Sequence, residues 1–135
     1  MEKFSIEIWD FNYSLAFTCL YTLSNDSLTI TRISGIKNEK DSFLFRYSLK
    51  KDEQKKISKY LSSQNFDSLK NNYETPLIDD GDRKRIKIRI GDSALKTIDI
   101  SNYYQKNLGE LFDYINQIIP IPIQFKIKYV NPKQP

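Results

Sequence analysis

The sequence predicts an α+β fold, in which an antiparallel sheet packs against helices. Hydrophobic residues alternate with a period of two in the first third of the chain, and with a period near 3.6 in two later segments. The expected strands come in runs instead of alternating singly with helices, which favours α+β over a doubly wound parallel sheet. A length of 135 residues, 39% of them hydrophobic, suits one domain over residues 1–135.

Four strands are expected between Phe4 and Tyr47. The residues expected to point into the core are Phe4, Ile6 and Ile8; Tyr13, Leu15, Phe17, Cys19 and Tyr21; Leu28 and Ile30, with Ile33 nearby; and Phe43, Phe45 and Tyr47. Turn-forming residues separate the four groups at 10–12, 24–26 and 35–41. We therefore expect an antiparallel meander with one aromatic, buried face and one more polar face.

A helix is expected next, with Ser48 as its N-cap, over the run LKKDEQKKISKYL. Its apolar face carries Ile57, Tyr60 and Leu61. Ser62-Ser63 ends it, and a short helical turn over 65–69 would place Phe66 and Leu69 beneath it.

The remaining elements are a hairpin, a second helix and a last strand. Ile86, Ile88 and Ile90 alternate with basic residues, and Gly91-Asp92 is expected to be a two-residue turn leading to a returning strand over 95–100. The second helix carries its apolar residues at helical spacing (Leu108, Leu111, Phe112, Ile115, Ile118 and Ile119) and stops at Pro120. Alternation over 121–129 predicts a C-terminal strand, or else an extended tail, and residues 131–135 are expected to be disordered.

The composition argues against several kinds of catalysis. There is no histidine and a single cysteine, so a Ser-His-Asp triad, a Cys-His pair, a His-ligated zinc and a disulfide framework are excluded. Cys19 lies in phase with Phe17 and Tyr21, which predicts a buried, inert thiol. The four glycines are isolated and form no phosphate-binding loop. We therefore expect a protein that is not an enzyme and has no cofactor.

The N-terminal residues show no secretory signal, and the longest apolar stretch, at 118–123, is short and interrupted by proline. No membrane contact is expected. A cytoplasmic location is the expectation, in keeping with a single unpaired cysteine.

The net charge of +4 is unevenly distributed. Residues 1–48 hold 5 Lys/Arg against 6 Asp/Glu, whereas residues 49–135 hold 16 against 11. Arg85, Lys87 and Arg89 project from one side of the expected hairpin strand. With Lys126 and Lys128 they would form a cationic stripe, if the last strand pairs nearby. This stripe is either a solvated outer face or an electrostatic site for phosphates or an acidic protein.

Two further features are candidate sites. Asp79-Asp80-Gly81-Asp82 resembles a cation-binding loop, but an EF-hand needs Glu twelve residues along, where Ile90 stands. An ordinary turn without metal is therefore expected there. Trp9 and Phe11 are out of phase with Phe4, Ile6 and Ile8. They either fill the back of the sheet or stand exposed, and an exposed Trp-Phe pair would point to a binding surface.

The order of elements resembles that of the small cytoplasmic immunity proteins of bacterial toxin systems. The resemblance lies in the aromatic antiparallel sheet, the helix LKKDEQKKISKYL, the hairpin IDDGDRKRIKIRIGD and the closing helix LGELFDYINQIIP. It implies a protein that neutralises a cognate toxin by binding it. Many immunity proteins that block nucleases are acidic. This basic chain would therefore face an acidic contact surface on its toxin, or a different class of toxin.

Three function hypotheses follow. The first is a non-enzymatic protein-binding module, an immunity or inhibitor protein, in which a small set of residues makes the contact: Arg85, Lys87, Arg89, Asp79, Asp80, Asp82, Trp9 and Phe11. The alternative is a nucleic-acid-binding accessory protein that uses the same basic strand, although most aromatic residues are in phase with the buried face. A third possibility is β-augmentation at the edge of the meander.

Overall fold

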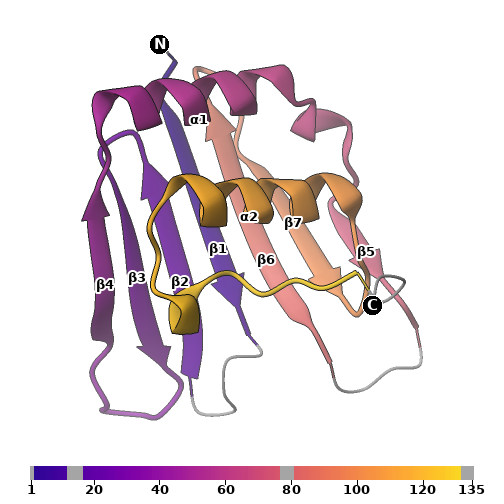
Figure 1. Ribbon diagram of the computed structural model, residues 1–135. Coiled ribbons are helices and arrows are strands. Elements are labelled where there is room, and N and C mark those ends of the chain that lie inside the picture. Colours follow the sequence, from indigo (N-terminus) through magenta and orange to yellow (C-terminus); the bar gives the residue numbers. More distant parts are fainter. Residues whose placement is uncertain (1, 12–16, 77–80, 132–135) are drawn as a thin grey trace.

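The computed structural model describes residues 2–11, 17–76 and 81–131. Within them seven strands form one sheet in the order β4-β3-β2-β1-β6-β7-β5 (Figure 1). The strands are β1 (Phe4–Asp10), β2 (Phe17–Ser24), β3 (Ser27–Ser34), β4 (Ser42–Ser48), β5 (Asn72–Glu74), β6 (Arg83–Ile90) and β7 (Lys96–Ser101). All neighbours are antiparallel except β5 and β7, which run parallel. The α+β class and the N-terminal meander are thereby confirmed.

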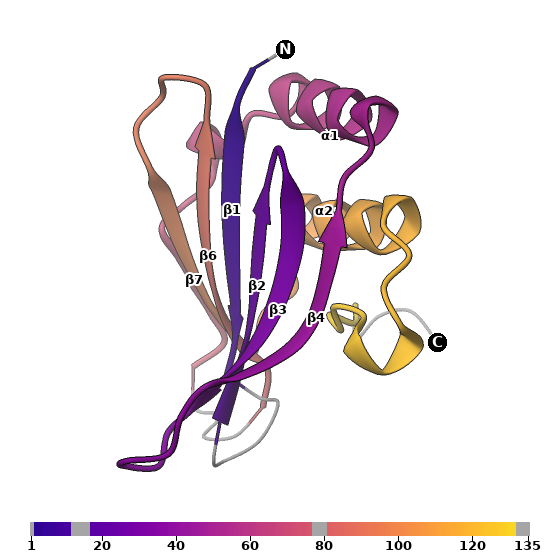
Figure 2. The same cartoon turned by 90° about the vertical axis from the view of Figure 1, so that its left-hand side faces the viewer.

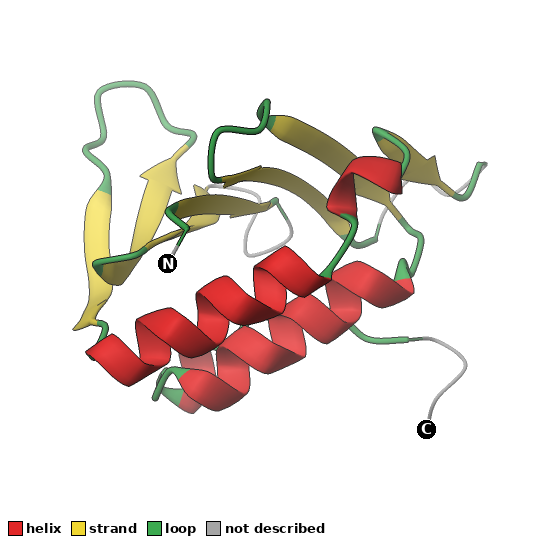
Figure 3. Cartoon of the chain, turned by 90° about the horizontal axis from the view of Figure 1, so that it is seen from above, coloured by secondary structure: helices red, strands yellow, loops and turns green. Residues whose placement is uncertain are grey.

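The helices lie on one face of the sheet. Helices α1 (Lys51–Ser63) and α2 (Lys106–Ile118) cross the strands side by side, and the C-terminal segment follows below α2 (Figures 1 and 2). Seen from above, both helices lie on the same side of the sheet (Figure 3). No described helix covers the opposite face, which we call the open face. None of the helices in the described ranges is long and apolar enough to cross a membrane.

The core lies between the sheet and the two helices. Alternation along β1 buries Phe4, Ile6 and Ile8, and the same period on β6 buries Ile86 and Ile88. The helices contribute their apolar stripes to the same cluster, with Ile57 and Leu61 from α1 and Leu108, Leu111, Phe112 and Ile115 from α2. One continuous core results, since each element buries only the side that its period makes apolar.

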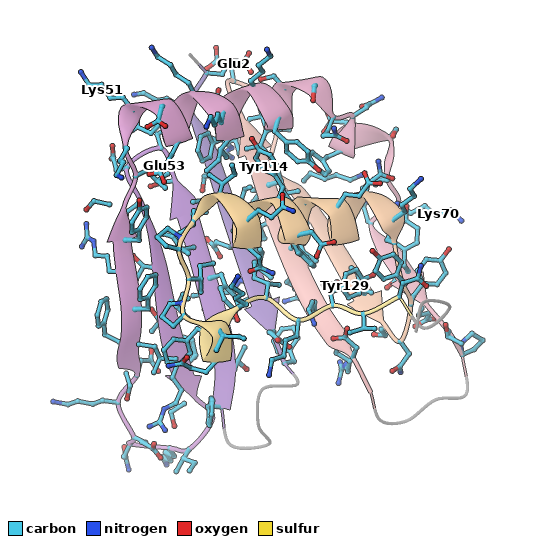
Figure 4. All side chains as sticks on the ribbon, in the orientation of Figure 1. Glu2, Lys51, Glu53, Lys70, Tyr114 and Tyr129 are labelled. Atoms are coloured by element: carbon cyan, nitrogen blue, oxygen red, sulfur yellow. The ribbon has the colours of Figure 1, made fainter. Side chains whose placement is uncertain are left out.

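Helix α1 begins two residues later than expected. Its N-cap is Lys50 and not Ser48. The carboxylate of Glu53 (Figure 4) accepts a hydrogen bond from the backbone N–H of Lys50 at 2.8 Å and another from the hydroxyl of Tyr47 at 3.0 Å. A glutamate that reaches back from the first turn satisfies an otherwise unpaired N–H, so no serine cap is needed.

A β-bulge in β4 overturns the expectation that Phe43, Phe45 and Tyr47 share one face. Ile30 pairs with Phe45 while the next residue, Thr31, pairs with Phe43, so one extra residue of β4 interrupts the register. The bulge moves Phe43 to the open face, where its side chain is 65% exposed. Phe45 and Tyr47 still pack against the core.

The second half of the chain contains two other differences. The loop of the β6–β7 hairpin spans residues 91–95 and is not a two-residue turn, because Ser93 folds back to hydrogen-bond the backbone of Ile90. The segment after α1 contains the expected helical turn, η1 (Phe66–Ser68), and then the short strand β5, which the sequence did not indicate.

The predicted C-terminal strand is absent from the described residues. Residues 119–131 contain only the single turn η2 (Ile123–Phe125) and otherwise run in extended form across the covered face of the sheet. Ile121 and Ile127 are buried there, so the alternation reflects packing onto the core and not strand pairing. Lys126 and Lys128 consequently lie in a different layer from Arg85, and the expected common stripe does not form.

Candidate functional site

The open face is formed by the residues that alternate with the buried ones. Glu7, Trp9 and Phe11 come from β1 and its end, and four basic residues come from β6: Arg83, Arg85, Lys87 and Arg89. Strand pairing aligns these two sets, because Trp9 is opposite Arg85 and Glu7 is opposite Lys87. The expected contact residues of these two strands are thus brought together on one surface.

The basic residues of β6 are interleaved with carboxylates. Asp99 of β7 is opposite Arg85, and it accepts a hydrogen bond from Nε of Arg85 at 2.7 Å. This bond raises the pKa of Arg85 above its ordinary value, so the guanidinium stays charged. Glu7 lies beside Lys87 in the same way. The basic side chains of β6 and their carboxylate neighbours therefore form a surface of mixed charge with a positive excess, and not an uninterrupted cationic stripe.

An apolar band crosses the open face next to the basic strand. Trp9 is opposite Leu20 of β2, which is opposite Thr31 of β3, which is opposite Phe43 of β4. Ile33 follows Thr31 on the same face. The indole Nε1 of Trp9 donates to Glu7 at 3.0 Å, which fixes the ring against the sheet. Trp9 is half-buried and Phe11 is 38% exposed, so both are accessible to a partner.

A hollow of about 330 Å³ adjoins Phe11 at the end of the basic strand. Its lining comes from four elements: Phe11 follows β1, Arg83 to Arg85 belong to β6, Asp99 to Ser101 to β7, and Asn72 to β5. A second hollow of about 290 Å³ lies near the other end of the sheet, between α1, η1 and the β6–β7 loop. Only the first opens beside the predicted contact residues.

Asp82, one of the predicted contact residues, points away from this surface. It forms an ion pair with Nζ of Lys84, which faces the core and is 2% exposed in its side chain. Asp79 and Asp80 lie outside the described residues, so their predicted role stays a prediction. The described part of the chain contains no cluster of three or more carboxylate or cysteine side chains that could hold a metal ion.

Lys84 is a buried charge that the alternation argument missed. Its Nζ lies 3.6 Å from a carboxylate oxygen of Asp10 and 5.4 Å from the ring centroid of Tyr129. The hydroxyl of Tyr129 accepts from the backbone N–H of Gln105 and donates to the carbonyl of Tyr103, each at 2.6 Å. Lys84, Asp10 and Tyr129 together join the C-terminal segment to the sheet, which is a structural role.

The thiol of Cys19 is buried, as expected. Burial raises its pKa to about 11, so the nucleophilic thiolate is scarce near neutral pH. It is therefore a core side chain and not part of a reactive site.

Three residues of the open face were not predicted as contact residues from the sequence: Leu20, Ile33 and Phe43. For Leu20 the signal was present, because it is out of phase with Cys19 and Tyr21. For Phe43 there was none, since a bulge is not visible in the hydrophobic period.

Comparison with known proteins adds no family to this picture. The chain matches no protein-family model, and no curated protein sequence is similar to it.

Proposed function

We propose that this chain is a non-enzymatic protein-binding module and that the open face is its contact surface. In its most concrete form it is an immunity or inhibitor protein that neutralises a bacterial toxin by covering it. One observation carries the proposal: an apolar band that runs from Phe43 to Trp9 ends directly beside the arginines of β6, on a face that no described helix covers.

The chemistry of this face suits a protein partner. Tryptophan and arginine are the residues that most often carry the binding energy of protein interfaces, with apolar neighbours that exclude water around them. The carboxylates of Glu7 and Asp99 lie among the basic side chains. They would oppose a phosphate backbone, whereas a protein surface of mixed charge can match them.

A nucleic-acid partner is the second candidate, and one observation favours it. Trp9 and Phe11 lie beside the basic strand, so aromatic and cationic groups are closer together than the sequence pattern suggested. Stacking on such rings, together with phosphate contacts, is how single strands are bound. This candidate predicts binding to generic single-stranded DNA at low salt that weakens steeply as salt is added.

The decisive experiment compares two triple charge reversals. The tagged protein is first used to capture a partner from its native lysate, with and without nuclease, and the affinity of that partner is then measured. Replacing Arg85, Lys87 and Arg89 by Glu is expected to weaken binding at least about tenfold, because these side chains face the partner. The partner's own activity should be inhibited by the wild-type protein and not by this variant.

The matched control reverses Lys51, Lys55 and Lys59 on the exposed side of α1, where Lys51 points away from the sheet (Figure 4). It makes the same change in net charge on the opposite layer and should change affinity less than about twofold. Equal effects of both variants would show that net charge and not the open face governs binding. Loss of the captured material on nuclease treatment would favour nucleic acid.

A further inference from the structure

We propose that the hollow beside Phe11 is a subsite that receives a carboxylate from an extended, acidic segment of the partner protein. The inference rests on the proposed function and names the chemistry of the partner at one place. The hollow lies where β1 ends beside β6 and β7, and its volume of about 330 Å³ can hold one amino-acid side chain with part of its backbone.

The charges of the hollow favour an anion. Arg83 and Arg85 contribute two guanidinium groups, and among the described residues of the lining Asp99 is the one carboxylate. Asp99 accepts from Nε of Arg85. In the described ranges, the Nη atoms of Arg85 make no hydrogen bond to another side chain. A guanidinium held by Nε presents its two-nitrogen edge, which binds a carboxylate through two parallel hydrogen bonds.

The other walls distinguish a peptide carboxylate from a free inorganic anion. Asn72 and Ser101 add neutral polar groups, and Phe11 supplies an apolar wall. An inorganic anion leaves that wall unused, whereas the methylene groups of a glutamate side chain can pack on it. Trp9 continues the apolar surface beyond the hollow. A segment that enters the hollow can therefore extend along the open face.

The test uses a blocked peptide of alternating glutamate and phenylalanine, and the same peptide with glutamine in place of glutamate. Binding is followed by the backbone amide signals of the ¹⁵N-labelled full chain. The acidic peptide is expected to shift the signals of Phe11, Arg85 and Ser101, and to bind at least about tenfold more tightly than the glutamine peptide. Binding of both peptides with equal affinity would contradict the proposal.

A pair of single variants locates the charge. Arg85→Gln removes one positive charge inside the hollow, and Arg46→Gln removes one from β4, on the same face, where Arg46 is exposed and opposite Thr29. Arg85→Gln should weaken binding of the acidic peptide about tenfold, because a bidentate contact is lost, and Arg46→Gln less than about twofold. Equal losses would mean that the face attracts the peptide by diffuse charge, and the subsite would be wrong.

Two competitors test the other sources of negative charge. Inorganic phosphate that shifts the same amide signals while the peptide does not would assign the hollow to free anions. An oligothymidylate that binds there more tightly than the peptide would assign it to nucleic acid.

The captured partner distinguishes this subsite from the proposed function. If its binding is insensitive to Arg85→Gln but is lost on charge reversal of β6, the proposed function holds and this subsite is wrong. If the binding of the captured partner is insensitive to Arg85→Gln and to the charge reversal, both the subsite and the proposed function are wrong.

Discussion

Lys84 is the residue at which the structure departs most from what its neighbours suggest. It lies in a run of basic residues, yet its ammonium group is enclosed with Asp10 and Asp82 beneath Tyr129. A charge can be buried at tolerable cost when opposite charges satisfy it, but removal of one partner leaves an uncompensated charge behind. The three-residue group is therefore expected to be sensitive to single substitutions.

We expect Lys84→Met to lower the free energy of unfolding by about 3 kcal/mol, since Asp10 is left buried without its cation. Urea unfolding measures this, and Lys87→Met on the same strand serves as the control. Lys87 faces the open side, so its replacement should change stability by no more than about 0.5 kcal/mol. Adding Asp10→Asn to Lys84→Met should restore part of the loss. An equal effect of the two lysine variants would refute this account.

Cys19 gives a prediction for alkaline pH. Its pKa is raised from 9.0 to about 11 in the folded chain, with burial as the main cause. Above pH 9 the unfolded chain releases the thiol proton while the folded chain keeps it, so the contribution of Cys19 to stability is complete below pH 9 and is lost as the pH rises through 11. Burial also raises the pKa of Tyr129, which acts in the same direction.

The measurement is the melting temperature between pH 8 and pH 11. It should fall with pH in the wild-type protein and fall less steeply in Cys19→Ala. At pH 8 the native thiol should not react with a disulfide reagent and should react fully in denaturant. Rapid reaction in the native state would show that Cys19 is accessible.

At the scale of the element, helix α2 depends on a glycine for close packing. The side chain of Gln105 accepts the backbone N–H of Leu108 at 2.9 Å and so caps the first turn. Gly109 lies one residue further, buried against the ring of Tyr104, and a Cβ at this position would overlap the phenol. Tyr104 is itself stacked on Tyr129 at 4.8 Å between centroids, so its ring cannot move freely.

We expect Gly109→Ala to lower stability by about 1–3 kcal/mol through overpacking, although alanine is the better helix former. In a Tyr104→Ala background the overlap is absent, and the same substitution should raise stability by about 1 kcal/mol. Thermal unfolding of the four proteins measures both effects. A stabilising effect in both backgrounds would mean that Tyr104 does not restrict this turn.

The elements also show what the sequence can and cannot predict. Strands β1, β2, β3 and β6 follow from simple alternation because one face is buried and a shift by one residue would expose it. The bulge in β4 adds a single residue whose effect depends on the neighbouring strand. The C-terminal segment has the alternation of a strand, but Pro120 and Pro122 lack the N–H groups that a ladder needs, and its isoleucines are buried against the core instead.

The candidate site was also predictable only in part: which side chains share a face follows from the sequence, and which strands pair does not. Arg85, Lys87, Arg89, Trp9 and Phe11 could be grouped because each is out of phase with a buried neighbour. That Arg85 is opposite Trp9 depends on the pairing of β1 with β6, two strands far apart in the sequence. No local pattern encodes such a pairing, and the hollow beside Phe11 depends on it.

At the scale of the whole molecule, the described residues cover one face of the sheet, with three crossing segments. Helix α1, helix α2 and the C-terminal segment lie one below the other across the strands (Figure 1). The third of these has almost no regular structure, and side-chain contacts hold it. The amide of Asn116 donates to the carbonyl and accepts from the N–H of Ile127, and the hydroxyl of Tyr21 donates to the carbonyl of Phe125 at 2.9 Å.

This arrangement predicts that the C-terminal segment is part of the cooperative core and not an appendage. Ile127 is 5% exposed and Ile123 is 82% exposed within the same segment. Ile127→Ala should lower the free energy of unfolding by about 3 kcal/mol, because it leaves a cavity between the segment and the sheet, while Ile123→Ala should change it by less than about 0.5 kcal/mol. Both variants are compared with the wild type by urea unfolding, with tryptophan fluorescence reporting on Trp9 across the sheet. Coincident loss of the fluorescence and circular dichroism signals in Ile127→Ala is expected if segment and sheet unfold together. Equal, small effects of the two substitutions would show that the segment leaves the core in solution, and the covered face would then be completed by the two helices alone.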